Sequence, residues 1–493
     1  MKPVKRKIHL WKHANISQMK EEILNFAKDF STKFSQKPNV ETMWKEITTY
    51  LSNIIDKHVP SKMTTTRFNQ PWITREIKQL SRRKKKSFKK ASLSSKHRRY
   101  YQQLKKKTQN ACRIAYNNYV TNIITPESTS NPKKFWSFIT SKRKESSGVA
   151  PLKSSDGHIH SDPKTKANIL NNQFSSVFNS GEDPSTIKSM KSPPHRSMPN
   201  IYISTEGVRK LLAGLNIHKA AGPDGVSTRM LKEFSSELSP VFSILFQATI
   251  DQGIIPKDWK KADVAPIFKK GIKSCPANYR PVSLTSVVCK VMEHIVCSNI
   301  LRHCDKYNIL TDAQHGFRKH RSCETQLILT VQDLVKNLDS KGQTDIILLD
   351  FSKAFDKVPH QRLLHKLHHY GITGTTHAWI SDFLKEREQR VIVDGCASKT
   401  APVSSGVPQG SVLGPLLFLL FINDLPDYVS SSSNVRLFAD DCVLYRDITS
   451  PSDAYQLQKD LDGLQQWEKD WLMEFHPQKC QILHITNKKY QLG

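Results

Sequence analysis

Two apolar segments that contain carboxylates constrain the fold of this chain more than any other feature. The first, residues 345–350, ends on Asp350, and the second, residues 435–445, has Asp440 and Asp441 between two apolar runs. A carboxylate at the end of a buried strand is costly unless it is paired or binds a cation. If residues 435–445 form a hairpin with the acidic pair at its turn, a neighbouring strand that ends in Asp350 brings three carboxylates together.

Three carboxylates at one tip are typical of sites that hold two hard cations about 3.5 to 4 Å apart for in-line displacement at phosphorus. In a polymerase, one ion lowers the pKa of a primer hydroxyl, and the other neutralises charge on the triphosphate and on the departing pyrophosphate. The alternative is that Asp440 and Asp441 are turn residues and that Asp350 caps a helix. For an isolated Asp pair this alternative is favoured. The flanking residues are therefore needed to distinguish a metal site from a structural turn.

The positive charge of the chain is concentrated in its first third. The net charge is +31, and residues 1–150 contain 34 Lys or Arg against 9 Asp or Glu. Residues 75–118 are predicted to form a long basic helix with interleaved tyrosines, which is typical of a segment that binds a phosphate backbone. Its densest run comprises Arg82, Arg83, Lys84, Lys85, Lys86, Lys89 and Lys90. A nuclear localisation signal and a solvated helix face explain residues 82–86 equally well.

Composition and periodicity divide the chain into three expected parts. Residues 1–125 are expected to be a basic, mostly helical region that binds nucleic acid. Residues 126–202 are rich in Ser, Pro and Lys and are expected to be a linker. Residues 203–493 alternate between helix-like and strand-like patterns and are expected to form a compact domain, with its core at residues 255–490.

The cysteines and the apolar runs indicate an intracellular protein. The nine cysteines contain no Cys-x-x-Cys pair and do not cluster as a disulfide framework does, so reduced thiols are expected. No apolar segment follows Met1, so a secretory signal is not expected. The longest apolar run, residues 412–422, is interrupted by Gly414 and Pro415 and is too short to span a bilayer. We therefore expect a soluble protein.

The residues around the carboxylates resemble the motifs of reverse transcriptases from non-LTR (LINE-type) retrotransposons. Residues 349–356 resemble the first catalytic motif, residues 438–441 the acidic-pair box, and residues 405–418 the motif that holds the incoming nucleotide. Further similar segments are residues 220–225, 265–271, 278–284 and 314–318 of the fingers and residues 471–480 of the last palm motif, where His476 replaces the usual Asn. The ordered set spans residues 205–490, and motifs that confirm one another in order are specific.

The resemblance implies an α+β fold, with the fingers and palm of a right-hand polymerase, an antiparallel palm sheet with helices, and a mostly helical basic region before them. It implies an RNA-directed DNA polymerase in which Asp350 and Asp440 are the main metal ligands and Asp441 supports them. The implied cofactor is two Mg²⁺ ions, with Mn²⁺ as a substitute. The implied partners are template RNA, a DNA primer and dNTPs, together with element RNA in a ribonucleoprotein of the cytoplasm and nucleus, and no membrane.

The resemblance also implies a nucleotide pocket. Phe355 occupies the family's sugar-gate position, where an aromatic ring blocks a ribose 2′-hydroxyl, although a core Phe is equally natural there. Gln409 and Gly410 match the pair that cradles the nucleotide, because Gly lets the backbone approach closely. Arg280 and either Lys269 or Lys270 match the residues of the fingers that are expected to hold the triphosphate.

Four further residues lie close to these motifs. Lys479 is a candidate proton donor to pyrophosphate, although a single Lys near a chain end is more often a surface residue. Asp356 is expected to cap a helix that begins near His360. His315 and His360 are expected to be structural residues with satisfied hydrogen bonds.

Intact proteins of the LINE type, which this sequence resembles, are longer. Many lineages have an endonuclease before the polymerase, and a thumb follows the polymerase. Neither is visible here, so we expect a chain that lacks both and holds a primer–template duplex poorly. The first alternative function is a basic RNA-binding protein that keeps the palm as an inactive scaffold. The second is a two-metal nuclease, which would not need the pocket residues Phe355 and Gln409.

Overall fold

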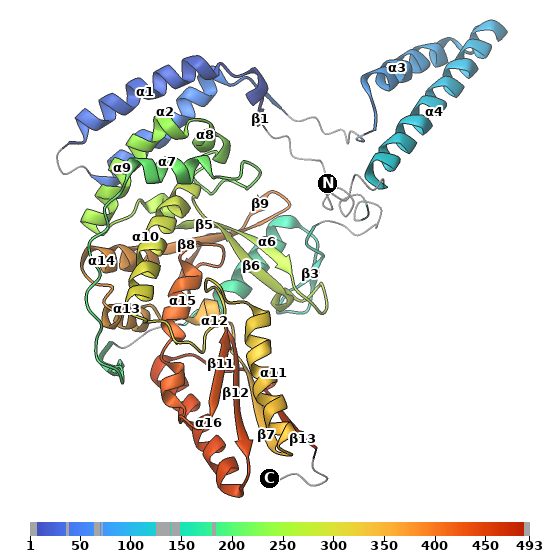
Figure 1. Ribbon diagram of the computed structural model, residues 1–493. Coiled ribbons are helices and arrows are strands. Elements are labelled where there is room, and N and C mark those ends of the chain that lie inside the picture. Colours follow the sequence, from blue (N-terminus) through green and yellow to red (C-terminus); the bar gives the residue numbers. More distant parts are fainter. Residues whose placement is uncertain are drawn as a thin grey trace. The chain divides into compact units, whose positions relative to one another are not determined.

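The computed structural model describes residues 7–35, 39–63, 70, 72–124, 139, 148–179 and 184–487 (Figure 1). The chain has an α+β fold, as expected from the sequence, and the described residues form four separate sheets. It divides into two compact units: residues 1–9 and 61–148 form the first, and residues 10–60 and 149–493 form the second. Among the described residues, no helix combines the length and the apolar character that crossing a membrane requires.

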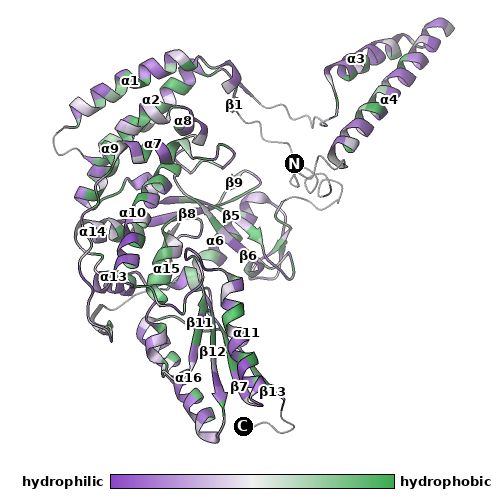
Figure 2. Cartoon of the chain, viewed as in Figure 1, coloured by the Kyte–Doolittle hydropathy of each residue, from purple (hydrophilic) through white to green (hydrophobic). Residues whose placement is uncertain are grey.

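The first unit is dominated by two helices that pack on each other, α3 (Arg75–Lys90) and α4 (Ser95–Ile124). Two short antiparallel strands, β1 (Lys7–His9) and β2 (Ser61–Met63), belong to the same unit. Figure 2 shows α3 as almost wholly hydrophilic. The prediction of one long helix over residues 75–118 was wrong, because the chain turns at residues 91–94 before α4 begins.

The start of α4 has a local cause. The Ser94 hydroxyl accepts a hydrogen bond from the backbone N–H of His97, at 3.3 Å, and so satisfies one of the N–H groups that a helix start leaves open. The returning helix then packs its aromatic side chains on the preceding segment. The rings of Phe88 and Tyr101 lie 5.2 Å apart, and those of Trp72 and Tyr116 lie 5.0 Å apart.

The second unit contains a cluster of helices around one apolar core (Figure 1). Asn15 and Asn39 cap the first two helices through their side-chain oxygens. Trp44 and Trp259 meet edge to face in this core, with ring centroids 5.5 Å apart. The helices are α1 (Ile16–Lys33), α2 (Val40–His58), α7 (Thr205–Ala213), α8 (Thr228–Glu233), α9 (Ser235–Gln252) and α10 (Val287–Lys306).

A five-stranded sheet follows, with the strand order β10-β8-β5-β6 and with β9 paired to β8. Only β5 and β8 run parallel, and the other pairs are antiparallel. The strands are β5 (Lys261–Phe268), β6 (Tyr279–Leu284), β8 (Arg387–Val393), β9 (Cys396–Ala397) and β10 (Ala401–Val403). Helix α6 (Pro163–Ser175) buries Leu170 and Phe174 against Val264 and Val391 of this sheet. A small hairpin, β3 (Leu152–Lys153) and β4 (Ile159–His160), contributes Leu152 to the same core.

A four-stranded antiparallel sheet has the order β11-β12-β7-β13. Its strands are β7 (Gln343–Asp350), β11 (Asn434–Phe438), β12 (Asp441–Ile448) and β13 (Gln481–Thr486). Side chains alternate between its faces. Leu349 and Leu444 share a core with Trp467 of α16 (Pro451–Trp471), whereas Tyr445 bonds Asp333 of α11 (Cys323–Asp339). The two helices therefore lie on opposite faces of this sheet (Figure 1).

Short connecting helices join the two larger sheets. Helix α15 (Gly414–Ile422) is buried along its whole length after Pro415. The α-helices are α12 (Ala354–Lys357), α13 (His360–His369), α14 (Gly374–Leu384) and α15 (Gly414–Ile422). Short 3-10 turns are η1 (Trp11–His13), η3 (Pro184–Thr186), η4 (Lys257–Lys260), η5 (Pro276–Asn278) and η6 (Leu425–Tyr428).

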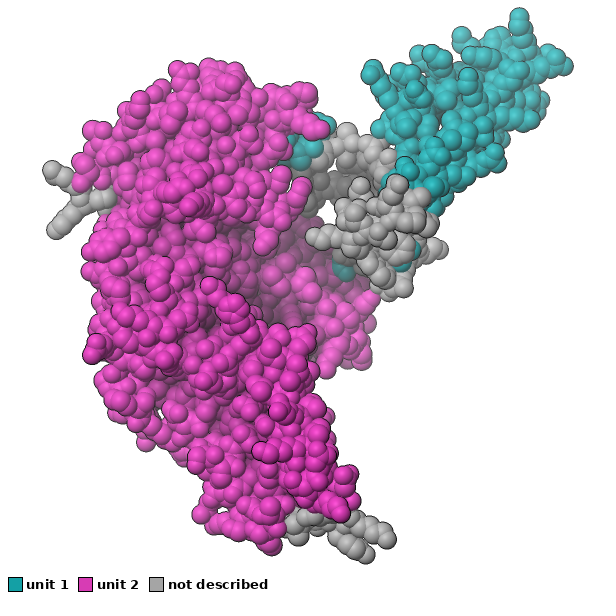
Figure 3. All heavy atoms as spheres, viewed as in Figure 1, with its two compact units in different colours: residues 1–9, 61–148 teal, residues 10–60, 149–493 magenta. Residues whose placement is uncertain are grey.

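The two units divide the chain at other points than the expected boundaries at residues 125 and 202 (Figure 3). Residues 10–60 join the larger unit because Met19 and Trp44 are buried in its core. Residues 149–202 do so because Leu170 is buried against the five-stranded sheet. These segments join the larger unit because their apolar side chains are buried against residues that are distant in sequence, and composition does not reveal such contacts.

Candidate active site

Three carboxylates meet at one end of the four-stranded sheet. Strand β7 ends at Asp350, strand β12 begins at Asp441, and these two residues are directly opposite each other in the antiparallel ladder. Phe438 pairs with Asp441 across β11 and β12, so Ala439 and Asp440 form the turn between these strands. This is the arrangement expected from the hairpin pattern, with Asp350 supplied by the neighbouring strand.

The three carboxylates interact electrostatically. Partial burial raises the pKa of Asp441, and the negative charges of Asp440 and Asp350 raise it further. The Lys479 ammonium lies 2.8 Å from a carboxylate oxygen of Asp350 and offsets part of this charge. In the part of the chain that the structure describes, no three His, Cys, Asp or Glu side chains already form a metal-coordinating set. The carboxylates nevertheless fit hard cations, because they are oxygen ligands whose mutual repulsion a cation would relieve.

The carboxylates open into a cleft of about 610 Å³, which is large enough for a nucleotide. Asp350 and Asp440 line one side of the cleft, and the side chains expected to bind the nucleotide also border it. They are Lys269, Lys270, Arg280, Phe355, Gln409, Gly410 and Lys479. Within the larger unit, every predicted site residue except Asp441 lines this cleft, and Asp441 lies opposite Asp350 in the strand ladder beside it.

Phe355 is half-buried in the wall of this cleft. Its ring stacks on that of Phe418, with centroids 4.4 Å apart, and meets the ring of Phe317 edge to face at 6.4 Å. The two interpretations from the sequence, a core Phe and a pocket Phe, are therefore compatible. One face is held by packing, and the residue still borders the cleft.

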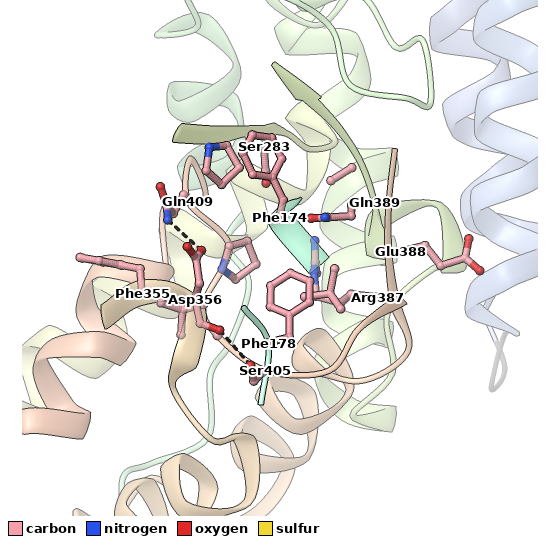
Figure 4. A pocket seen from close by; sticks show the side chains of 16 residues that line it. Phe174, Phe178, Ser283, Phe355, Asp356, Arg387, Glu388, Gln389, Ser405 and Gln409 are labelled. Atoms are coloured by element: carbon pink, nitrogen blue, oxygen red, sulfur yellow. Dashed lines mark hydrogen bonds between the residues drawn. The ribbon is translucent and has the colours of Figure 1, made fainter. Parts of the chain in front are cut away.

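Gln409 and Gly410 lie beside strand β6. Gly410 has φ +108°, and a Cβ added there would lie 2.7 Å from the backbone oxygen of Ser283. The backbone N–H of Ser283 donates to the Gln409 oxygen at 2.8 Å, so the close approach that requires Gly is to β6 itself. The Gln409 side chain donates to a carboxylate oxygen of Asp356 at 2.8 Å (Figure 4).

The cations of the cleft come from the five-stranded sheet and from the segment before β13. Burial lowers the pKa of Lys269, and the neighbouring charges of Arg280 and Lys479 lower it further, whereas Asp350 raises it. Lys269 is thus close to both the basic and the acidic groups of the cleft. Lys270 also lines the cleft, and its charge acts on Lys269.

Comparison with known protein families identifies the segment that contains this cleft. Residues 267–492 match the family described as reverse transcriptase (RNA-dependent DNA polymerase). Residues 267–492 belong to the reverse transcriptase family. All seven pocket residues and all three carboxylates lie within this segment.

The chain is similar to proteins of mobile elements. An RNA-directed DNA polymerase from the mobile element jockey of Drosophila melanogaster is 30% identical over 307 residues, which cover 61% of this chain and 33% of that protein. A probable RNA-directed DNA polymerase from the transposon BS of the same fly is 28% identical over 364 residues, which cover 70% of this chain and 39% of that protein. The chain is therefore similar to RNA-directed DNA polymerases of mobile elements, and it spans a third to two-fifths of the length of these relatives.

Next to the cleft that Asp350 and Asp440 line, and sharing Phe355 and Asp356 with it, lies a second, smaller cavity of about 40 Å³ (Figure 4). Asp356, Gln389 and the buried Arg387 line it, together with Phe174 and Phe178. The cavity has room for only a few water molecules and not for a nucleotide.

The structure corrects one prediction and fits another. Helix α13 starts after Pro359 without a side-chain cap, so the prediction that Asp356 caps it was wrong. Asp356 is held instead by the amide of Gln409, which offers the hydrogen bond that its buried carboxylate needs. His360 is buried and hydrogen-bonded to the Gly406 oxygen at 2.8 Å, and one ring nitrogen of His315 lies 2.9 Å from the Thr325 hydroxyl. The contact of His360 fits its expected structural role. For His315 the expectation of satisfied hydrogen bonds holds only in part, because its other ring nitrogen is buried without a hydrogen-bond partner among the described residues.

Sequence reasoning missed one residue that supports the loop before α15. Glu293 of α10 is buried, and its carboxylate accepts hydrogen bonds from the backbone N–H groups of Val412, at 2.6 Å, and of Leu413, at 3.0 Å. These donors precede α15, so Glu293 caps that helix directly after the loop that contains Gly410. Nothing in the local sequence indicates this contact, because more than a hundred residues separate its partners.

The predicted nucleic-acid-binding residues lie in the other unit, on α3. Six of the seven are exposed, and Lys84 is half-buried. The groove between α3 and α4 has a volume of about 570 Å³ and is lined by five basic or His side chains, by Ser87 and by the half-exposed ring of Tyr100. The basic or His side chains are Arg83, Lys86, Lys90, Lys96 and His97. This groove offers positive charge and an aromatic ring within one surface.

Proposed function

We propose that this chain catalyses RNA-directed DNA synthesis, in which a deoxynucleotide is transferred from a dNTP to the 3′-hydroxyl of a primer. The observation that carries the proposal is the cross-strand pair of Asp350 and Asp441 beside Asp440. The cleft that Asp350 and Asp440 line also contains Arg280 and Lys269. An acidic group for cations and a basic group for a triphosphate within one cleft suit nucleotidyl transfer.

In this proposal the four-stranded sheet is the palm, and the five-stranded sheet with its surrounding helices is the fingers. Asp350 and Asp440 would hold two Mg²⁺ ions, or Mn²⁺ in their place, and Asp441 would support them. When bound, such ions supply positive charge that lowers the pKa of the primer hydroxyl and stabilises the departing pyrophosphate. The mutual repulsion that raises the pKa of Asp441 supports this assignment, because cations would relieve it.

Arg280 and Lys269 are proposed to bind the triphosphate. The guanidinium can bind two phosphate oxygens at once, whereas the Lys ammonium acts as a point charge. We favour Lys269 over Lys270 because its charge is coupled to Arg280, Lys479 and Asp350. Lys479 is proposed to donate a proton to pyrophosphate, since its ammonium already lies 2.8 Å from Asp350.

Primer extension tests this function. The full chain is incubated with an oligo(dT) primer on a poly(rA) template, dTTP and Mg²⁺, and the extended primer is measured on a denaturing gel. Extension that depends on template, dTTP and Mg²⁺ is the expected result. A chain that binds the RNA but never extends the primer would contradict the proposal and support the RNA-binding alternative. Degradation of the template without extension would support the nuclease alternative.

Replacing Phe355 by Val is expected to reduce discrimination against ribonucleotides by about tenfold or more, which corresponds to about 1.4 kcal/mol. The smaller side chain would leave space for a ribose 2′-hydroxyl beside Phe418. The ratio of kcat/KM for dTTP and for UTP in primer extension measures the effect. A Phe418→Leu variant is the control for altered packing behind the ring, and an equal loss of discrimination in both variants would contradict the gate.

We also propose that α3 and α4 bind the RNA backbone, with template RNA and primer as partners and with element RNA in a ribonucleoprotein of the cytoplasm and nucleus. The exposed basic side chains of α3 support this role, because nucleic-acid affinity comes largely from neutralised phosphates. Tyr100, which is half-exposed in the same groove, could stack on an unpaired base.

Replacing Arg83, Lys86 and Lys90 together by Gln is expected to lower RNA affinity and the salt dependence of binding. For single-stranded RNA, the slope of log K against log salt should fall by about 0.7 for each phosphate contact that is lost. Fluorescence anisotropy with a labelled RNA at several salt concentrations measures both quantities. The matched control replaces the exposed Lys28, Lys164 and Lys459 of the other unit by Gln, which removes the same charge. Equal effects of the two triple variants would contradict a specific site on α3.

A further inference from the structure

The turn that contains Asp440 has an unusual backbone. Ala439, the residue directly before Asp440, has φ +54°, in the left-handed region that a residue with a Cβ rarely adopts. Ala439 is also buried, so its backbone N–H cannot rely on water for a hydrogen bond. This conformation costs energy and persists only if the surroundings hold it.

The side chain of Gln314 supplies that support. Gln314 is 2% exposed, and its amide oxygen accepts hydrogen bonds from the N–H groups of Ala439, at 3.0 Å, and of Gly316, at 2.7 Å. The amide nitrogen of Gln314 lies 3.5 Å from the Ala439 oxygen. A single buried amide thus faces both backbone groups of the strained residue.

The segment around Gln314 is itself attached to strand β11. The N–H of Leu437 donates to the Ala313 oxygen at 2.9 Å, and the N–H of His315 donates to the Leu437 oxygen at 2.8 Å. Gly316 packs so closely on the turn that an added Cβ would lie 2.4 Å from the Ala439 nitrogen. Residues 313–316, which we call the turn strap, therefore fix the backbone of the acidic turn from its edge.

The turn strap continues into the nucleotide cleft. The next residue, Phe317, is 59% exposed, lines the cleft and meets the ring of Phe355 edge to face at 6.4 Å. One short segment thus connects the turn that contains Asp440 with the wall that contains Phe355.

We propose that Gln314 is a positioning residue that holds the Asp440 carboxylate where it can bind a divalent cation, an inference that rests on the proposed function. Metal ligands have to be held within about half an ångström of the productive position by residues that do not touch the metal. Loss of such an outer partner typically weakens metal binding about 10- to 100-fold. Gln314 is suited to this role because it acts on the residue adjacent to Asp440.

The test replaces Gln314 by Met in the full chain, which keeps the length of the side chain and removes its hydrogen bonds. Mn²⁺ binding, measured by electron paramagnetic resonance of the free ion, is expected to weaken about 10- to 100-fold. Hydrogen exchange of residues 435–445 is expected to become faster. In primer extension, the Mg²⁺ concentration for half-maximal rate should rise, while RNA affinity stays unchanged.

The control is Gln343→Met. Gln343 is also a fully buried glutamine of the four-stranded sheet, but it lies at the opposite end of β7 from Asp350. This variant is expected to lose stability without losing Mn²⁺ affinity. A second variant, Gly316→Ala, displaces the same turn by steric contact and should reproduce the Mn²⁺ defect if Gln314→Met does not fold.

Each outcome decides one question. Unchanged Mn²⁺ affinity in Gln314→Met and Gly316→Ala, or an equal loss in Gln343→Met, would overturn the role of Gln314. If the wild-type chain binds no Mn²⁺, the metal site of the proposed function is wrong. Gln314 then cannot be a residue that positions a metal ligand. Hydrogen exchange would still report in that case whether Gln314 holds the turn.

Discussion

Primer extension is expected to fall about a thousand-fold or more when Asp440 is replaced by Ala. The proposed catalysis relies on cations held by Asp350 and Asp440, and such ions contribute several kcal/mol to stabilising the transition state. Each increase of about 1.4 kcal/mol in the activation free energy lowers the rate about tenfold. A loss of about 4 kcal/mol of transition-state stabilisation therefore lowers the rate about a thousand-fold. The incorporation rate under saturating dTTP and Mg²⁺ is the quantity to measure. RNA affinity should be unchanged, because Asp440 is not part of the basic groove.

The matched control is Asp462→Ala. Asp462 is an exposed residue of α16 that accepts a hydrogen bond only from Gln458 within the described chain, so the same charge is removed far from the cleft. Activity close to wild type is expected for this control. Residual activity of Asp440→Ala within tenfold of wild type would contradict the assignment of Asp440 as a metal ligand.

Replacing Lys366 by Met is expected to destabilise the larger unit by about 3 to 5 kcal/mol. Lys366 of α13 is fully buried and forms an ion pair with Asp424, and its ammonium also donates to the Phe421 oxygen at 2.6 Å. The ring of Trp471 lies 3.7 Å from the same ammonium. Removing the cation would leave the Asp424 carboxylate buried. Among the described residues, the Trp467 N–H, at 3.0 Å, would then be its one remaining side-chain donor.

Urea unfolding at pH 7, followed by Trp fluorescence, measures this loss. Burial lowers the pKa of Lys366 to about 8, so the ammonium is still mainly protonated at that pH. The double variant Lys366→Met with Asp424→Leu is the control, because a buried ion pair replaced as a whole by apolar side chains often costs little. Recovery of most of the stability in the double variant is expected. A single variant as stable as wild type would show that the ion pair is not needed to join α13, α15 and α16.

The local patterns of the sequence predicted the strands of the candidate site well. Two apolar runs joined at an acidic pair predicted the hairpin of β11 and β12, and an apolar run that ends in Asp350 predicted β7. These signals are reliable because the period of a strand and the identity of a turn depend on neighbouring residues. The same kind of signal failed over residues 75–118, where Lys and Arg favour helix throughout and only the cap at Ser94 marks the break.

Contacts of buried polar residues were not predictable in the same way. Asp356 was expected to cap a neighbouring helix, yet its partner is Gln409, which lies 53 residues further along the chain. Gln314 lies within residues 314–318, a segment that resembles the family's motifs. Its hydrogen bond with Ala439, however, joins residues that are 125 positions apart in the sequence. Many polar side chains of the chain could satisfy a buried donor, and the packing of the whole core selects one of them.

The sequence alone determined the proposed chemistry, because the three carboxylates, the expected pocket residues and their order lie in contiguous motifs. The tertiary structure alone decided how these groups are supported. The cap of α15 by Glu293, the ion pair of Lys366 and the bonds from Gln314 to the acidic turn all join residues that are distant in sequence. A motif records which atoms take part in a reaction. The positions of those atoms depend on buried hydrogen bonds, and these form only when distant segments pack together and exclude water.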